Sequence, residues 1–269
     1  MIGSAAVSAF FAGAVAILAT VAIERFGGSL GGILGSAPTT IVPASIGFWL
    51  GANGVQNFQD SLFAVPAGMC VNAVFLYSWR IFPKYIAIDN LKYKLFCMML
   101  ISIGIWTLCA FGMVLGLEYF VDHLLGTALT AIAGLLLFGG WACTKNPPSP
   151  KGTQKVSRTV LFMRGLLASI AIGISIYLAT IGDAVLAGMS SVFPAIFLTT
   201  MCSVWLAQGE AVQAGAVGPM MLGSSSVSAY ALLAAFLIPI FDWPTGVVLS
   251  WCGSVLLVSI PAWFWLKER

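Results

Sequence analysis

Long apolar runs separated by short polar stretches dominate the pattern along this chain. A membrane-spanning helix needs about 20 apolar residues, and roughly nine runs approach that length. The pattern therefore predicts an all-α fold, a polytopic transmembrane helical bundle. The predicted spans are 2–24, 28–50, 61–82, 95–117, 125–144, 161–181, 184–206, 217–240 and 245–266.

The first apolar run begins at Ile2, with no basic residue ahead of it. A cleavable signal peptide carries a basic segment before its apolar core. We therefore expect this run to be the first span.

Composition supports the same class of protein. Hydrophobic residues make up 60% of the chain and charged residues only 8%, whereas a soluble domain is about half apolar and a quarter charged. The net charge of +3 comes from Lys and Arg in short loops, so the partners that we expect are the lipid bilayer and a small-molecule or ion substrate, and not nucleic acid. A homo-oligomer is neither required nor excluded.

The Lys and Arg residues can all be placed on one side of the membrane. Cytoplasmic loops of membrane proteins carry an excess of Lys and Arg. With the N-terminus on the non-cytoplasmic side, nine spans place all 12 Lys and Arg residues and the C-terminus on the cytoplasmic side. One span more or fewer would mix the two sides, so the span number and the topology support each other. The identity of the membrane stays open. The outer loops then hold Asp60, Glu118, Asp122, His123, Asp183 and Asp242.

A polar linker at 145–160 divides the chain into a first half of five spans, 1–144, and a second half of four, 161–269. The two halves share landmarks in the same order. Trp49-Leu50 is followed by Val55-Gln56, as Trp205-Leu206 is followed by Val212-Gln213, and each Trp lies eleven residues after a proline, Pro38 or Pro194. These landmarks predict an internal repeat.

The predicted repeat is inverted, because an odd number of spans, five, separates the two copies. Inverted repeats are typical of secondary transporters, whose two halves meet near the middle of the bilayer. The sequence therefore favours a multi-pass secondary carrier that moves a small solute or ion by alternating access. Inverted repeats also occur in channels, so an ion or small-solute channel is the alternative, and a non-transporting membrane scaffold or receptor is a further one.

One unusual span in each half predicts the substrate site. Pro38, Thr39 and Thr40 follow a glycine-rich segment in the first half, and Pro194, Thr199 and Thr200 lie in the matching span of the second. Proline removes a backbone donor and interrupts a helix, and interrupted helices at matching places often bind substrate. Alternatively, the glycines allow close packing and the prolines only kink the helices. Ser224 and Ser225, in the next helix, are further candidates for substrate binding.

Polar residues after each unusual span form a second candidate group. Glu210 is an isolated carboxylate, with no Lys or Arg between Arg164 and Lys267. We predict that Glu210, and Asp60 at the corresponding place in the first half, bind a coupling proton or cation, because burial disfavours the charged form of a carboxylate. The alternative is that both lie in solvated loops at opposite membrane faces. Other polar residues predicted along the pathway are Asn53, Gln56, Gln208, Gln213 and Asn72.

No catalytic, metal or cofactor site is predicted. The one histidine, His123, lies beside Asp122 in an outer loop, and the six cysteines are scattered singly in or at the ends of apolar runs. Sequence motifs that bring together an acid, a base, a nucleophile or metal ligands are missing. We therefore do not expect an enzyme. No Lys or Arg is expected inside the membrane either, so an anionic substrate would be held by amides, hydroxyls and helix ends.

The segment Gly31-Gly-Ile-Leu-Gly35-Ser-Ala-Pro-Thr-Thr-Ile-Val-Pro43 resembles the glycine-rich turn of the TauE/SafE-type anion exporters. Those proteins also consist of two repeats, each with a glycine-rich segment that leads to a proline. The resemblance covers two stretches of about 40 residues, and the expected glycine triplet is replaced by Ala37-Pro38-Thr39 and by Val192-Phe193-Pro194. It implies transport of sulfonates, sulfite or similar small anions.

Overall fold

The computed structural model describes residues 7–18, 38–145 and 157–268, and every regular element among them is a helix. The predicted all-α class is therefore confirmed for this part of the chain. After a short N-terminal helix, Val7–Leu18, the elements are α3 (Ile41–Gly51), α4 (Val55–Ile81), η1 (Phe82–Tyr85), α5 (Leu91–Tyr119), η2 (Val121–His123), α6 (Leu124–Thr144), α7 (Arg158–Thr180), α8 (Ala184–Ser191), α9 (Ala195–Gln208), α10 (Glu210–Gly223), α11 (Ser225–Phe241), α12 (Trp243–Ser254), the π-helical turn η3 (Val255–Ser259) and α13 (Ile260–Lys267).

Among the described residues, seven helical segments are long and apolar enough to cross a membrane, and they cover the predicted spans from the third to the ninth. The chain therefore has the architecture of an integral, multi-pass membrane protein. Parts of the first two predicted spans are the short apolar helices Val7–Leu18 and Ile41–Gly51. Residues 19–37 between them lie outside the described residues, so the total of nine spans stays a prediction.

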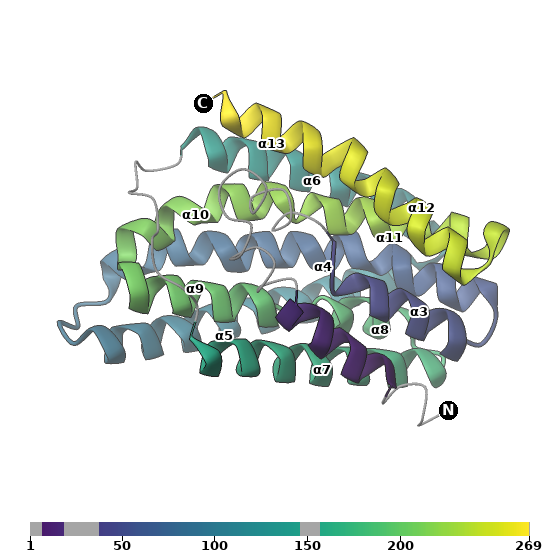
Figure 1. Ribbon diagram of the computed structural model, residues 1–269, viewed down its shortest axis with the longest axis horizontal. Helices are drawn as coiled ribbons and strands as arrows, with labels where there is room; N and C mark the ends of the chain where they lie inside the picture. The colour runs from purple at the N-terminus through teal and green to yellow at the C-terminus, as the bar shows by residue number, and fades with distance from the viewer. Residues whose placement is uncertain (1–6, 19–37, 146–156, 269) are drawn as a thin grey trace.

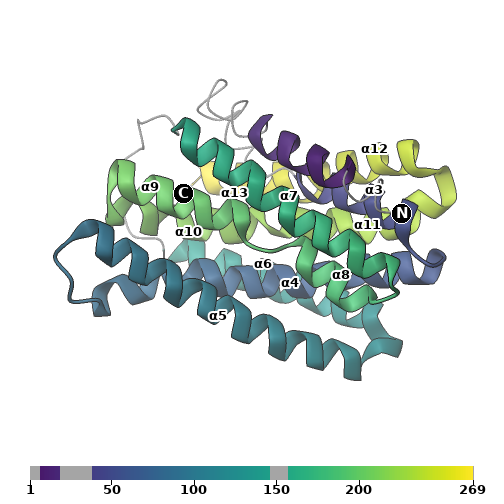
Figure 2. The ribbon, with the colours of Figure 1, turned by 90° about the horizontal axis from the view of Figure 1, so that it is seen from below.

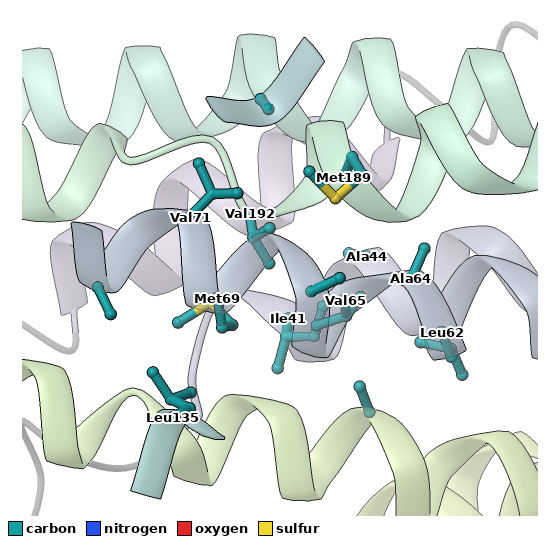
Figure 3. Close-up of a cluster of buried hydrophobic side chains, with 14 of the residues drawn as sticks. Ile41, Ala44, Leu62, Ala64, Val65, Met69, Val71, Leu135, Met189 and Val192 are labelled. Carbon is teal, nitrogen blue, oxygen red and sulfur yellow. The ribbon is translucent and has the colours of Figure 1, made fainter. Parts of the chain in front are cut away.

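Helix α4 forms the centre of the bundle. Its side chains contact α3, α5, α6, α8, α10 and α11, and most of its length is buried. Figure 3 shows Leu62, Val65 and Met69 of α4 among side chains from neighbouring elements, such as Ile41 of α3 and Leu135 of α6. The predicted pathway residues on α4 thus lie on a helix that is packed on several sides by other helices.

Helix α5 lies along one edge of the bundle, as Figure 2 shows, and exposes large apolar side chains there. Leu108 is 74% exposed and Phe111 67%. So much exposed apolar surface would be unfavourable in water but is expected of a helix that faces lipid. The exposed apolar side chains of α5 therefore account for part of the high apolar content of the chain.

The predicted interruption of span 184–206 is confirmed. Helix α8 ends at Ser191, Val192 to Pro194 form a non-helical crossing, and α9 begins at Ala195. Pro194 cannot donate a backbone hydrogen bond, which is why the helix breaks beside it. In the first half, α3 likewise begins at Ile41, directly after Pro38, Thr39 and Thr40.

All described Lys and Arg residues lie toward one end of the bundle, and most described acidic residues lie at the other (Figure 1); the acidic exceptions are Asp89, Glu210 and Glu268. The end with the α4–α5 connection, the start of α7 and the C-terminus holds the described Lys and Arg residues and is called the basic end: Arg80, Lys84, Lys92, Lys94, Lys145, Arg158, Arg164 and Lys267. The other end, called the acidic end, holds Asp60, Glu118, Asp122, Asp183 and Asp242. Of these, Asp183 and Asp242 accept backbone hydrogen bonds at the starts of α8 and α12, as N-cap residues commonly do.

Two short helices run in opposite directions from the middle of the molecule. Helix α3 runs from there to the acidic end, and α9 runs to the basic end (Figure 1). Each then turns at a glycine into a longer helical segment. Gly54, before α4, has φ 95° and ψ 172°, and Gly209, before α10, has φ 89° and ψ 174°. Both values lie in a region that favours glycine.

Candidate functional site

Asn72 lies in the middle of α4 and contacts the interrupted helix directly. Its Nδ2 donates to the carbonyl oxygen of Val192 at 2.7 Å, and its Oδ1 accepts from Trp106 Nε1 at 2.8 Å. The Trp106 ring packs on Phe193 with 5.1 Å between the ring centroids. Asn72 is 1% exposed. Its carboxamide therefore satisfies a carbonyl at the point where the helix is broken.

Glycines bring α4 and the interrupted helix close together. A Cβ atom at Gly188 of α8 would collide with the backbone carbonyl oxygen of Ser61, and one at Gly68 of α4 would collide with the side chain of Val192. Small residues at such crossings allow backbones to approach closely in membranes. The span is therefore both interrupted and tightly packed through its glycine, and its role as a substrate site stays a prediction.

A buried arginine contacts the predicted substrate residues of α9. Arg164 of α7 is 5% exposed, and it donates from Nε to Thr199 Oγ1 at 3.1 Å and from a terminal nitrogen to Thr200 Oγ1 at 2.8 Å. Arg164 is therefore a basic side chain buried within the bundle, on a helix long and apolar enough to cross a membrane, and sequence did not predict such a residue. Arg164 follows the basic linker and resembles a flanking residue in sequence. Its position three residues inside the predicted span 161–181 was the feature of the sequence that could have indicated a buried arginine.

The region around the start of α3 is also polar. Ser45 of α3 and Tyr230 of α11 share a hydrogen bond of 2.7 Å between their hydroxyl oxygens. Ser225 and Ser228 of α11 are almost fully buried, and their hydroxyl oxygens have no partner among the described residues. Ser224 donates to the backbone carbonyl of Met221, so its hydroxyl is already satisfied.

Pro38, Thr39 and Thr40 precede the first turn of α3. Pro38 is buried and the two threonines are partly exposed. Thr40 is the N-cap residue of α3, but its side chain makes no capping hydrogen bond. The first backbone N–H groups of α3 therefore receive no side-chain cap from it.

A cavity of about 670 Å³ opens at the acidic end. Three carboxylate residues line it together with three carboxamide residues, and its lining includes no Lys or Arg. Gln56 donates to Asp60 Oδ1 at 2.8 Å. The lining residues are Asn53, Gln56, Asn57, Asp60, Glu118, Val121, Leu124, Ile181, Gly182, Asp183, Ala184 and Val185.

Glu210, the second carboxylate predicted to bind a coupling ion, lies at the other end of the bundle and forms an ion pair. Its Oε2 lies 2.7 Å from Nζ of Lys94 on α5. The sequence offered no basic partner within 45 residues of Glu210, and the fold supplies one from 116 residues away. Glu210 is the first residue of α10 and its side chain is 40% exposed, so it lies at the basic end and not in the middle of the molecule.

Close to this ion pair, three fully buried side chains carry unsatisfied polar atoms. Trp79 of α4 and Trp205 of α9 pack at 6.0 Å between ring centroids, and Gln213 of α10 donates to the Met201 sulfur. The two indole nitrogens and Gln213 Oε1 have no hydrogen-bond partner among the described residues. The side chain of Gln208 lies outside the described residues.

The structure therefore distributes the predicted site residues over three levels of the bundle. Asn53, Gln56 and Asp60 line the cavity at the acidic end, and Glu210 and Gln213 lie towards the basic end. Between these ends lie Asn72, at the break, and Thr199 and Thr200, which Arg164 contacts. Asp60 and Glu210 are not brought together.

Within the described residues, no group of three or more His, Cys, Asp or Glu side chains is placed to hold a metal ion. Comparison with known protein families, with curated proteins and with solved structures finds no match to this chain. The resemblance to the TauE/SafE-type exporters stays a prediction.

Proposed function

We propose that this protein is a secondary carrier that moves a small solute or ion across a membrane. The observation that carries the proposal is the pair of half-helices, α3 and α9, which begin in the middle of the bundle and run to opposite ends. Each is followed by a turn at a glycine with nearly the same backbone angles and then by a long helical segment, which is α4 in the first half and α10 with α11 in the second. This arrangement supports the predicted inverted repeat, and half-helices of this kind form substrate sites in carriers.

The proposed solute site lies where the break between α8 and α9 meets α4. Phe193 and Trp106 supply aromatic surface there, and Asn72 supplies a carboxamide that holds the broken backbone. Arg164, with Thr199 and Thr200, adds a buried cation and hydroxyls on the side nearer the basic end. An arginine buried among hydroxyls would favour an anionic group on the solute.

The cavity at the acidic end is the proposed entrance. It is open, and half of its lining residues carry carboxylate or carboxamide groups, which water could hydrate. Of the two carboxylates predicted to bind a coupling ion, Asp60 fits that role better, because it lines the cavity while Glu210 is paired with Lys94. We propose that Asp60 binds the coupling proton or cation.

Counterflow in proteoliposomes tests the proposal. The full chain is reconstituted with unlabelled methanesulfonate or sulfite inside, and uptake of the same labelled anion is measured over a concentration series. A carrier gives saturable uptake that an opposite gradient of unlabelled anion accelerates. Flux that rises linearly with concentration and shows no counterflow would instead indicate a channel.

The same assay tests the coupling role of Asp60. Uptake by wild-type protein should depend on an imposed proton or sodium gradient, and the Asp60→Asn variant should lose that dependence while still giving counterflow. Asp122→Asn is the matched control, because Asp122 is exposed at the same end and does not line the cavity. Retained gradient dependence in Asp60→Asn would exclude Asp60 as the coupling site.

A further inference from the structure

Among the described residues, one ion pair joins the hairpin formed by α9 and α10 to α5 at the basic end, where α5 also packs beside α9. Lys94 of α5 reaches across to Glu210, the first residue of α10, at 2.7 Å. The Lys94 Nζ also lies 5.9 Å from the centroid of the Trp205 ring, a distance at which a cation interacts with an aromatic face. Lys94 thus contacts both helices of the hairpin.

Below Lys94, aromatic side chains fill the space between the hairpin and α4. Trp205 packs on Trp79, and neither ring is accessible to solvent. The Lys94–Glu210 pair, the Trp205 ring and the Trp79 ring therefore form a continuous series of contacts from α5 through the hairpin to α4. At the acidic end, described residues line an open cavity.

The closed arrangement at the basic end leaves buried polar groups unsatisfied. The indole nitrogens of Trp79 and Trp205 and the Oε1 atom of Gln213 have no hydrogen-bond partner among the described residues. Burying such groups is unfavourable, and water that entered between the hairpin and α4 would satisfy them. The ion pair therefore opposes a tendency of this end to open.

A hinge for such a movement lies next to the ion pair. Gly209 joins α9 to α10 with φ 89°, and the position of a Cβ atom on it would meet no other atom within 4 Å. The corresponding turn at Gly54 is held by uncharged amides instead, because Asn53 and Asn57 donate to the carbonyls of Thr180 and Gly182.

We propose that the Lys94–Glu210 ion pair is a latch that holds the α9–α10 hairpin against α5 and closes the pathway at the basic end, and that the present structure is the state open at the acidic end. This inference rests on the proposed carrier function. Breaking the pair would let the hairpin move about Gly209, separate Trp205 from Trp79 and admit water from the basic side.

Reactivity of a native cysteine reports this opening. Cys202 lies on α9 three residues before Trp205 and packs against the core. The full chain in detergent is treated with a maleimide, and modification of Cys202 is followed by peptide mass spectrometry. The Cys202→Ser variant confirms the assignment of the signal.

We expect Glu210→Gln and Lys94→Gln each to raise the rate of Cys202 modification, by up to about fivefold for an ion pair of ordinary strength. Lys92→Gln is the matched control, because Lys92 is exposed on the same turn of α5 and its rate should equal that of wild type. The exchanged double variant, Lys94→Glu with Glu210→Lys, should return the rate toward the wild-type value.

Wild-type rates in both single variants would overturn the proposal, as would a double variant as reactive as the single ones. Thermal melting identifies any variant that does not fold. If the single variants unfold, the double variant decides. A double variant that folds and reacts slowly supports the latch, and a double variant that unfolds or reacts fast contradicts it. The assay needs no transported solute, so a latch found without flux in proteoliposomes would show that the ion pair holds the hairpin, while contradicting the carrier proposal on which its role in closing a pathway rests.

Discussion

Asn72 provides hydrogen bonds at a place in the membrane where the backbone of the neighbouring helix is interrupted. Its two contacts, to Val192 and Trp106, join α4, α5 and the break between α8 and α9. The carboxamide suits this place because it offers a donor to one group and an acceptor to the other. Sequence identified Asn72 as a polar pathway residue, but its partners are 34 and 120 positions away and only the packed fold brings them together.

The Asn72→Ala variant should be less stable than wild type by about 1–3 kcal/mol, because it leaves a buried carbonyl and a buried indole N–H without partners. Trp106→Phe is the control, since it removes one of the two hydrogen bonds and keeps an aromatic ring against Phe193. We expect it to cost less, about 0.6 kcal/mol, as is typical of hydrogen bonds in membranes. Denaturant unfolding in detergent measures both, and equal losses would contradict the central role of Asn72.

Arg164 offers a second test at the scale of single residues. Arg164→Lys keeps the charge, but an ammonium group cannot reproduce the planar fork that contacts Thr199 and Thr200. Loss of one hydrogen bond to a charged group is worth about 1.5–3 kcal/mol, so anion uptake should fall about 10- to 100-fold.

The exposed Arg158, one and a half turns earlier on α7, is the matched control for this experiment. Arg158→Lys should take up the anion at the wild-type rate, and both variants are compared in proteoliposomes at equal protein content. Equal uptake by Arg164→Lys and wild type would remove Arg164 from the solute site.

At the scale of elements, sequence predicted the break in span 184–206 because a proline within an apolar run has a local effect. It predicted loops for Asp60 and Glu210, whereas both residues lie in the first two turns of helices, α4 and α10. Each of these helices begins directly after a glycine turn, and polar residues at a helix start resemble a loop when only hydropathy is considered. The Lys94–Glu210 pair could not be predicted, because it depends on how α5 packs beside the hairpin.

The crossing of α4 and α8 can be tested through its glycine. Gly188→Ala should lower the free energy of unfolding by about 1–3 kcal/mol, because the new methyl group meets the backbone carbonyl of Ser61, which cannot move aside without shifting α4. Gly104→Ala on α5 is the control. That position has open space around it, so alanine should be neutral or slightly stabilising through its higher helix propensity. Similar unfolding curves for the two variants would contradict the close packing.

At the scale of the whole molecule, the separation of charge predicted from sequence agrees with the fold. The described helices place their Lys and Arg residues at one end and most of their acidic residues at the other. Arg164 is the departure from this simple arrangement, because it lies on the side of the basic end but is buried within the bundle.

The orientation of the bundle is tested by labelling from one side of the membrane. The positive-inside rule places the basic end in the cytoplasm. In intact cells, an impermeant maleimide should therefore modify Asp122→Cys and spare Lys92→Cys, both positions being exposed. After the cells are opened, both should react. Modification of Lys92→Cys in intact cells would mean that the bundle has the reverse orientation.

Helix α5 is longer than a typical bilayer is thick. Its apolar stretch, 95–117, is 23 residues long between Lys94 and Glu118, which corresponds to about 35 Å of helix. The hydrocarbon core of a typical bilayer is about 30 Å thick, so α5 must tilt by about 30° or thicken the lipid around it. Because α5 lies at the edge of the bundle and exposes large apolar side chains there, this adjustment falls on a helix that lipid would contact directly.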